Sequence, residues 1–415
     1  MDRYVIKGGR PISGSIKAEG AKNSALPVIA AAISCKGSVV IENCPDISDV
    51  RNMYEIAKSL GAEVFYGENV LEIRPETLYS CSVSRELCEK TRTSVLTLGA
   101  LLSRERKARV FFPGGCEIGA RPIDMHLSAF EKMGATVTVL GDEIIVSAEN
   151  LVGADIYLPY PSVGATENVM LAAATASGRT RIFGAAREPE IADLAAALNA
   201  FGAKISGFGG DTVEIEGVKE LKGGRVKLGF DRIEAGTFLV LTASAGGEME
   251  ISGIKAENIY SLLVKLCENS CKIKIKNDII YLKSGKPKKP FALTTGPYPN
   301  FPTDLQPQMT VLAAASLGNS VIKDEVFPAR FSHAAELKKM GADISVKGGT
   351  AIVNGRGKLF GATVGSHDLR CGAALVIAGL IAEGKTVVKD VRFIERGYAN
   401  FVEKLSSLGA DIKAE

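Results

Sequence analysis

The sequence of 415 residues contains no tryptophan, and aromatic residues make up only 6% of it. Proteins that bind single-stranded nucleic acid usually stack bases on aromatic side chains, so this composition argues against that activity. The 50 lysines and arginines nearly balance the 47 aspartates and glutamates, which leaves a net charge of +3. A binding site for an anion must therefore be a local cluster of basic side chains.

Signals for metal binding, secretion and membrane insertion are also missing. The chain has three histidines, and none of its eight cysteines forms a CxxC pair, so we expect free thiols and no zinc or thioredoxin-type motif. Its longest apolar stretches, residues 25–34 and 373–382, are about half as long as a membrane-spanning helix. The opening MDRYVIKGGRP lacks the apolar region of a signal peptide, which predicts a cytoplasmic protein.

Two patterns recur along the chain with a common period. The first, a hydrophobic residue followed by Gly and Ala, stands between an amphipathic segment and a strand-like run. Its central residues lie 68 to 73 positions apart: Gly61, Gly134, Gly202, Ser270 (a degenerate copy), Gly341 and Gly409. The second is an Ala-rich apolar helix that ends at a glycine, in the left-handed position after the helix. Its glycines are Gly37, Gly178, Gly246, Gly318 and Gly384, with Arg106 at the equivalent place.

Each repeat therefore predicts a buried helix, a strand, an amphipathic helix and a β-hairpin, with hairpin turns near residues 209–211 and 277–278. The sixth repeat lacks its last strand, and the opening RYVIKGG resembles it. We therefore expect two α/β domains of three repeats each, one over residues 21–229 and one over residues 1–20 and 230–415. A solenoid is the alternative, but a solenoid would cap its ends rather than exchange a strand.

Charged residues occupy equivalent places before the helices of several repeats. Before the apolar helix the chain has Lys22, Arg92, Ser162, Arg232, Asp304, Asp368 and Arg370, and before the amphipathic helix it has Arg121, Arg187, Arg330 and Arg396. Helix N-termini and arginines both favour anions, so we expect a basic cleft for a substrate with several negative charges. In the alternative interpretation, each arginine is a solvated surface residue and Asp304 is a helix N-cap.

The segment FPGGCEIGARP at residues 112–122 has three glycines between Pro113 and Pro122. Cys116 is at its centre, five residues before Arg121, and a nearby guanidinium lowers the pKa of a thiol and makes it reactive. We interpret the segment as a lid that carries a reactive cysteine over bound substrate.

Several motifs together resemble the enolpyruvyl transferases that act on UDP-N-acetylglucosamine. They include GAKNSALP at 20–27, PGGCEIGARPIDMH at 113–126, PSVGATEN at 161–168, FPTDLQPQ at 301–308 and ERGY at 395–398. The resemblance covers essentially the whole chain. It implies two inside-out α/β domains, each of three pseudo-symmetric repeats of about 70 residues, with the active site between them. It also implies transfer of enolpyruvyl from phosphoenolpyruvate to the sugar 3′-hydroxyl, with release of phosphate, and no metal or organic cofactor.

The resemblance also implies residue roles. Phosphoenolpyruvate is expected to contact Lys22, Asn23, Arg121, Arg330, Arg370 and Arg396. The nucleotide sugar is expected to contact Asn23, Arg92, Arg121, Pro122, Ile123, Asp124, Met125, Ser162, Val163, Gly164, Asp304 and Val326. Catalysis is expected to depend on Cys116, Asp304, Lys22, Arg121 and Arg396, with Cys116 as proton donor and as the site of a covalent adduct. Cysteine-bearing members of this kind are usually targets of fosfomycin.

Some features depart from that family or leave alternatives open. Tyr160 stands where some members have a lysine, which removes one possible phosphate contact, and Leu96 stands where some members have a tryptophan. The alternatives are a shikimate-phosphate enolpyruvyl transferase, a catalytically idle paralogue that binds nucleotide sugar, and a repeat protein that binds nucleic acid. Whether Cys116 is chiefly acid or nucleophile stays open. The oligomeric state also stays open, with a monomer compatible.

Overall fold

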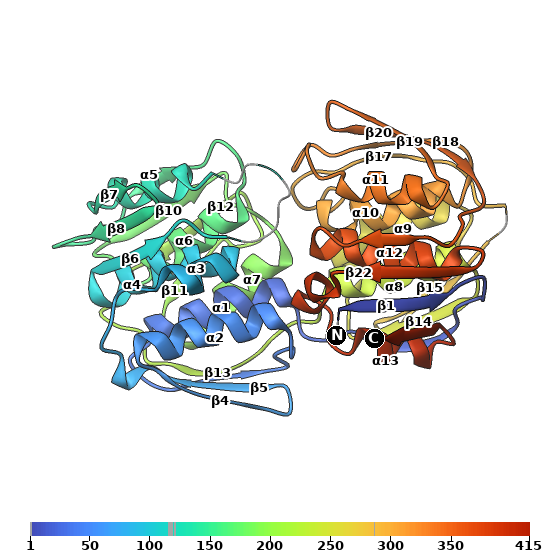
Figure 1. The fold of residues 1–415 in the computed structure, drawn as a ribbon. Helices are drawn as coiled ribbons and strands as arrows, with labels where there is room; N and C mark the ends of the chain where they lie inside the picture. Colours follow the sequence, from blue (N-terminus) through green and yellow to red (C-terminus); the bar gives the residue numbers. More distant parts are fainter. Residues whose placement is uncertain (1, 115–118, 120–121, 286) are drawn as a thin grey trace. The chain divides into compact units, whose positions relative to one another are not determined.

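The computed structural model describes residues 2–114, 119, 122–285 and 287–415. These residues form two compact units, each described by itself (Figure 1). The first unit contains residues 20–114 and 122–229, and the second contains residues 2–19 and 230–415. No helix in the described part of the chain has the length and apolar character that a membrane span requires.

Three apolar helices pack against one another at the centre of each unit. In the first unit they are α1 (Lys22–Ser34), α4 (Leu96–Glu105) and α6 (Val163–Ala173). In the second they are α8 (Arg232–Ala245), α10 (Gln306–Ala314) and α12 (Leu369–Ile381). Every residue of α1 from Ser24 to Ser34 is buried, because the helix has neighbours on all sides. The sheets lie outside these helices, which is the inside-out arrangement (Figure 1).

The first unit has three sheets and four further helices. The strand orders are β13 (Gly224–Lys227), β3 (Val39–Glu42), β5 (Val70–Arg74), β4 (Glu63–Gly67); then β6 (Lys107–Phe111), β8 (Glu143–Ser147), β7 (Thr136–Leu140); then β11 (Lys204–Ser206), β12 (Thr212–Glu216), β10 (Arg179–Phe183), β9 (Asp155–Tyr157). The helices are α2 (Ser48–Leu60), α3 (Arg85–Lys90), α5 (Asp124–Lys132) and α7 (Pro189–Ala200). Because β13 pairs in parallel with β3, the last strand of this unit returns to its first sheet.

The second unit repeats the plan with three four-stranded sheets. Their orders are β15 (Lys272–Lys276), β16 (Ile279–Lys283), β14 (Glu248–Ser252), β2 (Gly14–Lys17); then β17 (Ala292–Thr294), β18 (Leu317–Lys323), β20 (Thr350–Arg356), β19 (Asp343–Lys347); then β21 (Thr363–Gly365), β22 (Lys385–Lys389), β1 (Arg3–Lys7), β23 (Asp411–Ala414). The outer helices are α9 (Tyr260–Glu268), α11 (Ser332–Lys339) and α13 (Phe401–Ser407).

The N-terminal strand β1 lies between β22 and β23 and pairs antiparallel with both. It occupies the position that the sixth repeat leaves open, and its Ile6 side chain is fully buried. The two ends of the chain therefore share one sheet, and the repeats of the second unit form a closed ring rather than a solenoid.

The turn after each amphipathic helix has left-handed backbone in all six repeats. The five glycines, Gly61, Gly134, Gly202, Gly341 and Gly409, have φ between 86° and 110°, and Ser270 has φ of 79°. The degenerate copy thus keeps the turn without the glycine. The expected hairpin turn at Asn277 and Asp278 is confirmed, with φ of 50° and 57°.

The residues after the apolar helices largely confirm the sequence prediction. Left-handed backbone is found at Arg106, Gly178, Gly246, Gly318 and Gly384, with φ between 57° and 111°. Gly246 and Arg106 directly follow α8 and α4, whereas α6 ends at Ala173, five residues before Gly178. Gly37 is the exception: it is not left-handed, and its role is steric, because a Cβ there would lie 2.4 Å from the Lys222 carbonyl oxygen.

We expect Ser270→Gly to raise the free energy of unfolding by about 0.5–1 kcal/mol, because glycine relieves the left-handed strain of a residue with a Cβ. The matched reverse change, Gly202→Ser, introduces that strain at a site where a Cβ meets nothing within 4 Å. It should lower the free energy of unfolding by about 1 kcal/mol. Urea unfolding of both variants checks this, and changes of the same sign would contradict it.

Candidate active site

Asp304 accepts hydrogen bonds from two arginines in the second unit. It lies in the short 3₁₀ helix η4 (Thr303–Leu305), directly before α10. Its Oδ1 accepts from Nη1 of Arg330 at 2.7 Å, and its Oδ2 accepts from Nη2 of Arg370 at 2.9 Å. The side chain of Asp304 is 24% exposed, whereas those of the two arginines are 5% and 2% exposed. The carboxylate therefore balances two nearly buried positive charges.

This arrangement decides the protonation state of Asp304. Burial alone would raise the pKa of its carboxyl, but the guanidinium groups of Arg370 and Arg330 outweigh that effect and hold the pKa well below the usual value. Neither η4 nor α10 has a side-chain N-cap bond, so the interpretation of Asp304 as an N-cap is wrong. Both carboxylate oxygens are used by arginines instead.

Asp368 and Arg370 share one position in the repeat but have different tasks. Asp368 caps α12, because its Oδ1 accepts from the backbone N–H groups of Arg370 and Cys371 at 2.9 and 3.0 Å. This cap fixes the first turn of α12, from which Arg370 reaches Asp304. The second terminal nitrogen of Arg370, Nη1, donates to the hydroxyl of Tyr398 at 3.1 Å.

Arg330 lies before α11, next to a turn that Asp324 holds in place. Oδ1 of Asp324 accepts from the backbone N–H groups of Val326 and Phe327 at 3.0 and 2.8 Å. Its Oδ2 accepts from the hydroxyl of Thr303 at 2.7 Å, and that hydroxyl also accepts from Arg330 at 3.2 Å. Val326, which the sequence assigned to the sugar, is therefore fixed by the same carboxylate that supports the Arg330 contact.

Two further arginines were predicted at helix starts of the second unit. Arg396 is half-buried and ends the 3₁₀ helix η5 (Val391–Arg396), two residues before Tyr398. Arg232 is buried at the start of α8, behind the N-cap Asp231, with its guanidinium 5.7 Å from the ring centre of Tyr298.

In the first unit, Lys22 is the first residue of α1 and forms an ion pair with Asp49 of α2. Nζ of Lys22 lies 2.8 Å from Oδ2 of Asp49, and the two side chains are 13% and 3% exposed. Asn23 follows Lys22 and is half-buried. Arg92 is half-buried at the start of the 3₁₀ helix η2 (Arg92–Val95). Arg187, by contrast, is exposed and donates to the Gly209 carbonyl, as expected for a surface arginine.

The starts of α5 and α6 contain most of the residues predicted for the nucleotide sugar. Ser162 caps α6 by accepting from the N–H of Ala165 at 3.3 Å, and Val163 and Gly164 follow. Asp124 begins α5, with exposed Pro122 and buried Ile123 before it and half-buried Met125 after it.

Buried His126 joins these two helix starts. Its Nδ1 lies 3.0 Å from Nδ2 of Asn168, and a Cβ on Gly164 would lie 3.2 Å from its ring. Two helix N-termini thus lie beside each other, an arrangement that suits an anion.

Two predicted residues, Cys116 and Arg121, lie outside the described residues. The motifs and spacings did not assign a role to four further residues. Asp49 pairs with Lys22, Asp324 accepts from the hydroxyl of Thr303, Tyr398 accepts from Arg370, and Thr237 bonds to the hydroxyl of Tyr398. Tyr398 lies in the motif ERGY, and Thr237 lies in DRIEAGTF at residues 231–238, a further motif of the same resemblance. Within the described residues, no group of three or more His, Cys, Asp or Glu side chains is placed to hold a metal ion.

Comparison with known proteins shows the family to which the chain belongs. Residues 6–405 match the family of EPSP synthase (3-phosphoshikimate 1-carboxyvinyltransferase). The chain is 46% identical over 413 residues to the UDP-N-acetylglucosamine 1-carboxyvinyltransferase of Halothermothrix orenii, covering 100% of this chain and 99% of that protein. It is 45% identical over 411 residues to UDP-N-acetylglucosamine 1-carboxyvinyltransferase 2 of Listeria monocytogenes, covering 99% and 97%.

Solved structures share the fold over the full length. The enolpyruvyl transferase NikO from Streptomyces tendae is 25% identical with a TM-score of 0.89, covering 99% of this chain and 98% of that one. An EPSP synthase from Acinetobacter baumannii is 18% identical with a TM-score of 0.79, covering 100% and 99%, and this likeness concerns the fold alone.

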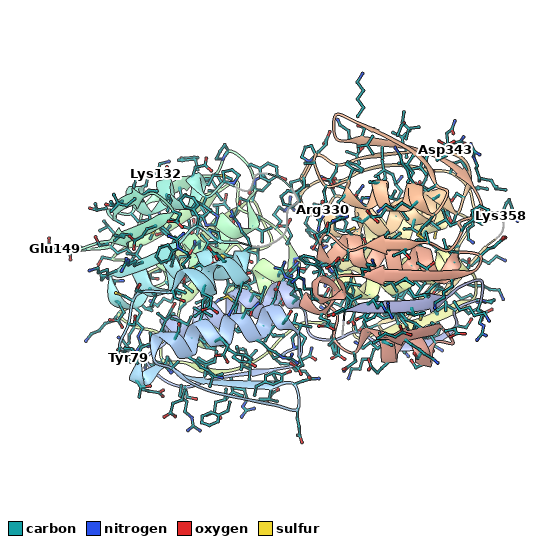
Figure 2. The ribbon with its side chains drawn as sticks, viewed as in Figure 1. Tyr79, Lys132, Glu149, Arg330, Asp343 and Lys358 are labelled. Atoms are coloured by element: carbon teal, nitrogen blue, oxygen red, sulfur yellow. The ribbon has the colours of Figure 1, made fainter. Side chains whose placement is uncertain are left out.

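We expect Asp304→Asn to lower the free energy of unfolding by about 3 kcal/mol, because it leaves two nearly buried guanidinium groups without a counter-charge. The matched control is Asp343→Asn, which removes an exposed partner of Arg356 and should change stability little. Figure 2 shows Asp343 and Arg330 well apart on the second unit. Equal effects in the two variants would contradict the assigned role of Asp304.

The pH dependence follows from the depressed pKa of Asp304. Its stabilising contribution is complete above the unfolded-state pKa of about 3.9 and is lost as the pH falls through the folded-state value. The difference in unfolding free energy between the wild type and Asp304→Asn should therefore be largest near neutral pH and shrink below about pH 4. Urea unfolding across this range measures it.

Proposed function

Because the chain belongs to the EPSP synthase family of carboxyvinyltransferases, we propose that it transfers the enolpyruvyl group of phosphoenolpyruvate to the 3′-hydroxyl of UDP-N-acetylglucosamine. The bond from the vinyl carbon to the phosphate oxygen breaks, the bond from that carbon to the sugar oxygen forms, and phosphate leaves. The observation that carries the choice of acceptor is identity of 44–46% over the full length to relatives named for that acceptor.

The charges of the second unit support the phosphoenolpyruvate half of the proposal. Phosphoenolpyruvate carries a phosphate and a carboxylate, and Arg330 and Arg370 present bidentate donors in a site with little water. Lys22, Asn23, Arg121 and Arg396 complete the proposed set. Positive groups of this kind also stabilise the charge that develops on a tetrahedral intermediate and on the departing phosphate.

Addition of the sugar hydroxyl across the double bond requires two proton transfers. The methylene carbon must gain a proton, for which we propose Cys116 as the donor, and the sugar hydroxyl must lose one, for which we propose Asp304. Elimination then removes a proton from the new methyl group while the carbon–oxygen bond to phosphate breaks, which restores the double bond in the product. In the free protein Asp304 is a weak base, because two guanidinium groups stabilise its charged form. When a bound anion shares the charge of Arg330 and Arg370, the pKa of Asp304 should rise. Binding of phosphoenolpyruvate would thus make Asp304 a stronger base.

The nucleotide sugar is proposed to lie at the helix starts of the first unit. Its diphosphate would use Arg92 and the N–H groups at the starts of α5 and α6, where Ser162 and His126 fix the backbone. The full proposed set adds Arg121, Pro122, Ile123, Asp124, Met125, Val163 and Gly164, with Asn23, Asp304 and Val326 at the sugar. No metal or organic cofactor has a part in this proposal.

This reaction would be the first committed step of peptidoglycan precursor synthesis, with a place in cell-wall formation and cell division. Its substrates are water-soluble metabolites, so we assign it to the cytoplasm. With a cysteine at position 116, the enzyme should also be a target of fosfomycin.

The test is phosphate release from phosphoenolpyruvate with each of two acceptors. We expect release with UDP-N-acetylglucosamine and none with shikimate 3-phosphate, and mass spectrometry should find the enolpyruvyl sugar nucleotide. Release only with the shikimate ester would overturn the acceptor. No release with either acceptor, in protein that still binds the sugar nucleotide, would favour the idle paralogue. Cys116→Ala is the control variant and should lose turnover while its binding of UDP-N-acetylglucosamine is retained.

A further inference from the structure

A chain of buried hydroxyl groups begins at Nη1 of Arg370, whereas Nη2 of the same side chain bonds to Asp304. Nη1 of Arg370 donates to the hydroxyl of Tyr398 at 3.1 Å, and that hydroxyl lies 2.8 Å from Oγ1 of Thr237. Nε2 of Gln308 donates to the same Oγ1 at 3.1 Å. The side chains concerned are buried, so water does not compete for these bonds.

The hydrogen bonds of this chain have a single consistent direction. Thr237 donates its only hydroxyl proton to the Ile233 carbonyl at 2.8 Å, so its oxygen must accept from Tyr398. Tyr398 then accepts from Arg370, and burial raises the pKa of the Tyr398 hydroxyl, which keeps it protonated. The order Arg370, Tyr398, Thr237, backbone carbonyl therefore uses every hydroxyl proton once.

The chain ties Arg370 to all three central helices of the second unit. Thr237 and its acceptor lie on α8, Gln308 lies on α10, and Arg370 lies on α12. Because these helices form the core, the hydroxyl of Tyr398 is held at a fixed point. A guanidinium that donates to it has little freedom to turn.

The other arginine of the cluster is held differently. Nη1 of Arg330 makes both of its bonds to Thr303 and Asp304, and its buried Nε has no hydrogen-bond partner among the described residues. Arg330 therefore retains donors for a ligand, whereas the two terminal nitrogens of Arg370 bond to Tyr398 and Asp304.

We propose that Tyr398 is a positioning residue for the transfer reaction, because its hydroxyl fixes the guanidinium of Arg370 at the distance that Asp304 and the anionic donor substrate require. This inference rests on the proposed function. It assigns to Tyr398 no contact with substrate, and it makes Thr237 and Gln308 the supports of Tyr398.

The test is Tyr398→Phe, which removes the hydroxyl and keeps the ring that packs on Phe401 at 4.7 Å between centroids. We expect kcat/KM for phosphoenolpyruvate to fall about tenfold to a hundredfold, the effect of losing a buried hydrogen bond to a charged group. Both a lower kcat and a higher KM for that substrate should contribute. The Kd of UDP-N-acetylglucosamine should change much less, within about threefold, since Asp304 is its proposed contact that bonds to Arg370 and most of its other proposed contacts lie on the first unit.

The matched control is Thr242→Val, which lies on α8 as Thr237 does. Thr242 is buried and makes the same kind of bond, to the Phe238 carbonyl at 3.1 Å, as Thr237 makes to Ile233. Its loss should reduce stability without changing either kinetic constant. If Tyr398→Phe does not fold, variants of Thr237 provide the test. Thr237→Val should lower kcat/KM for phosphoenolpyruvate. Thr237→Ser, which keeps the hydroxyl, should have a kcat/KM close to that of the wild type.

Unchanged kcat/KM in Tyr398→Phe, or an equal loss of UDP-N-acetylglucosamine binding, would overturn the positioning role. A crystal structure of Tyr398→Phe separates this inference from the proposed function. The inference expects the 2.9 Å contact of Arg370 with Asp304 to be broken or displaced, and an unchanged contact would refute it even if the wild type proved inactive with both acceptors.

Discussion

The central constraint of this structure is a carboxylate that two nearly buried guanidinium groups share. A guanidinium group stays charged even in the interior, so a buried arginine without a counter-charge destabilises the fold, and Asp304 pairs with both arginines at 2.7 and 2.9 Å. Asp304 and Arg370 occupy the same place in two different repeats, at the start of an apolar helix, whereas Arg330 lies before the amphipathic helix α11. The closed arrangement of three repeats brings them together, so the fold and the cluster depend on each other.

The same interaction limits the chemistry. A carboxylate stabilised by two cations is a poor base, and two cations neutralised by a carboxylate are weaker anion receptors. In the proposed mechanism, both functions return when the anionic substrate enters and shares the positive charge. In that proposal Arg370 is the fixed support of the cluster and Arg330, which is less constrained, receives the substrate.

Much of the fold could be predicted because its signals are local. The left-handed turn after each amphipathic helix needs only one residue, and Ser270 shows that the turn survives the loss of its glycine. The open edge of the sixth repeat pointed to the N-terminal segment, and β1 pairs there. Gly37 was misread because its requirement is a close backbone approach from Lys222, far away in the sequence.

The site could be predicted only in part for the same reason. Motifs and equivalent places in the repeats indicated Asp304, Arg330 and Arg370, but the N-cap alternative for Asp304 stayed open until its two partners were seen. Tyr398 and Thr237 are 161 positions apart, and no local pattern joins them. The most direct test is the pKa of Asp304, measured by carbon-13 NMR with Asp304→Asn for assignment. The account predicts no titration of this carboxyl between about pH 4 and 8 in the free protein, whereas an ordinary pKa near 4 would contradict it.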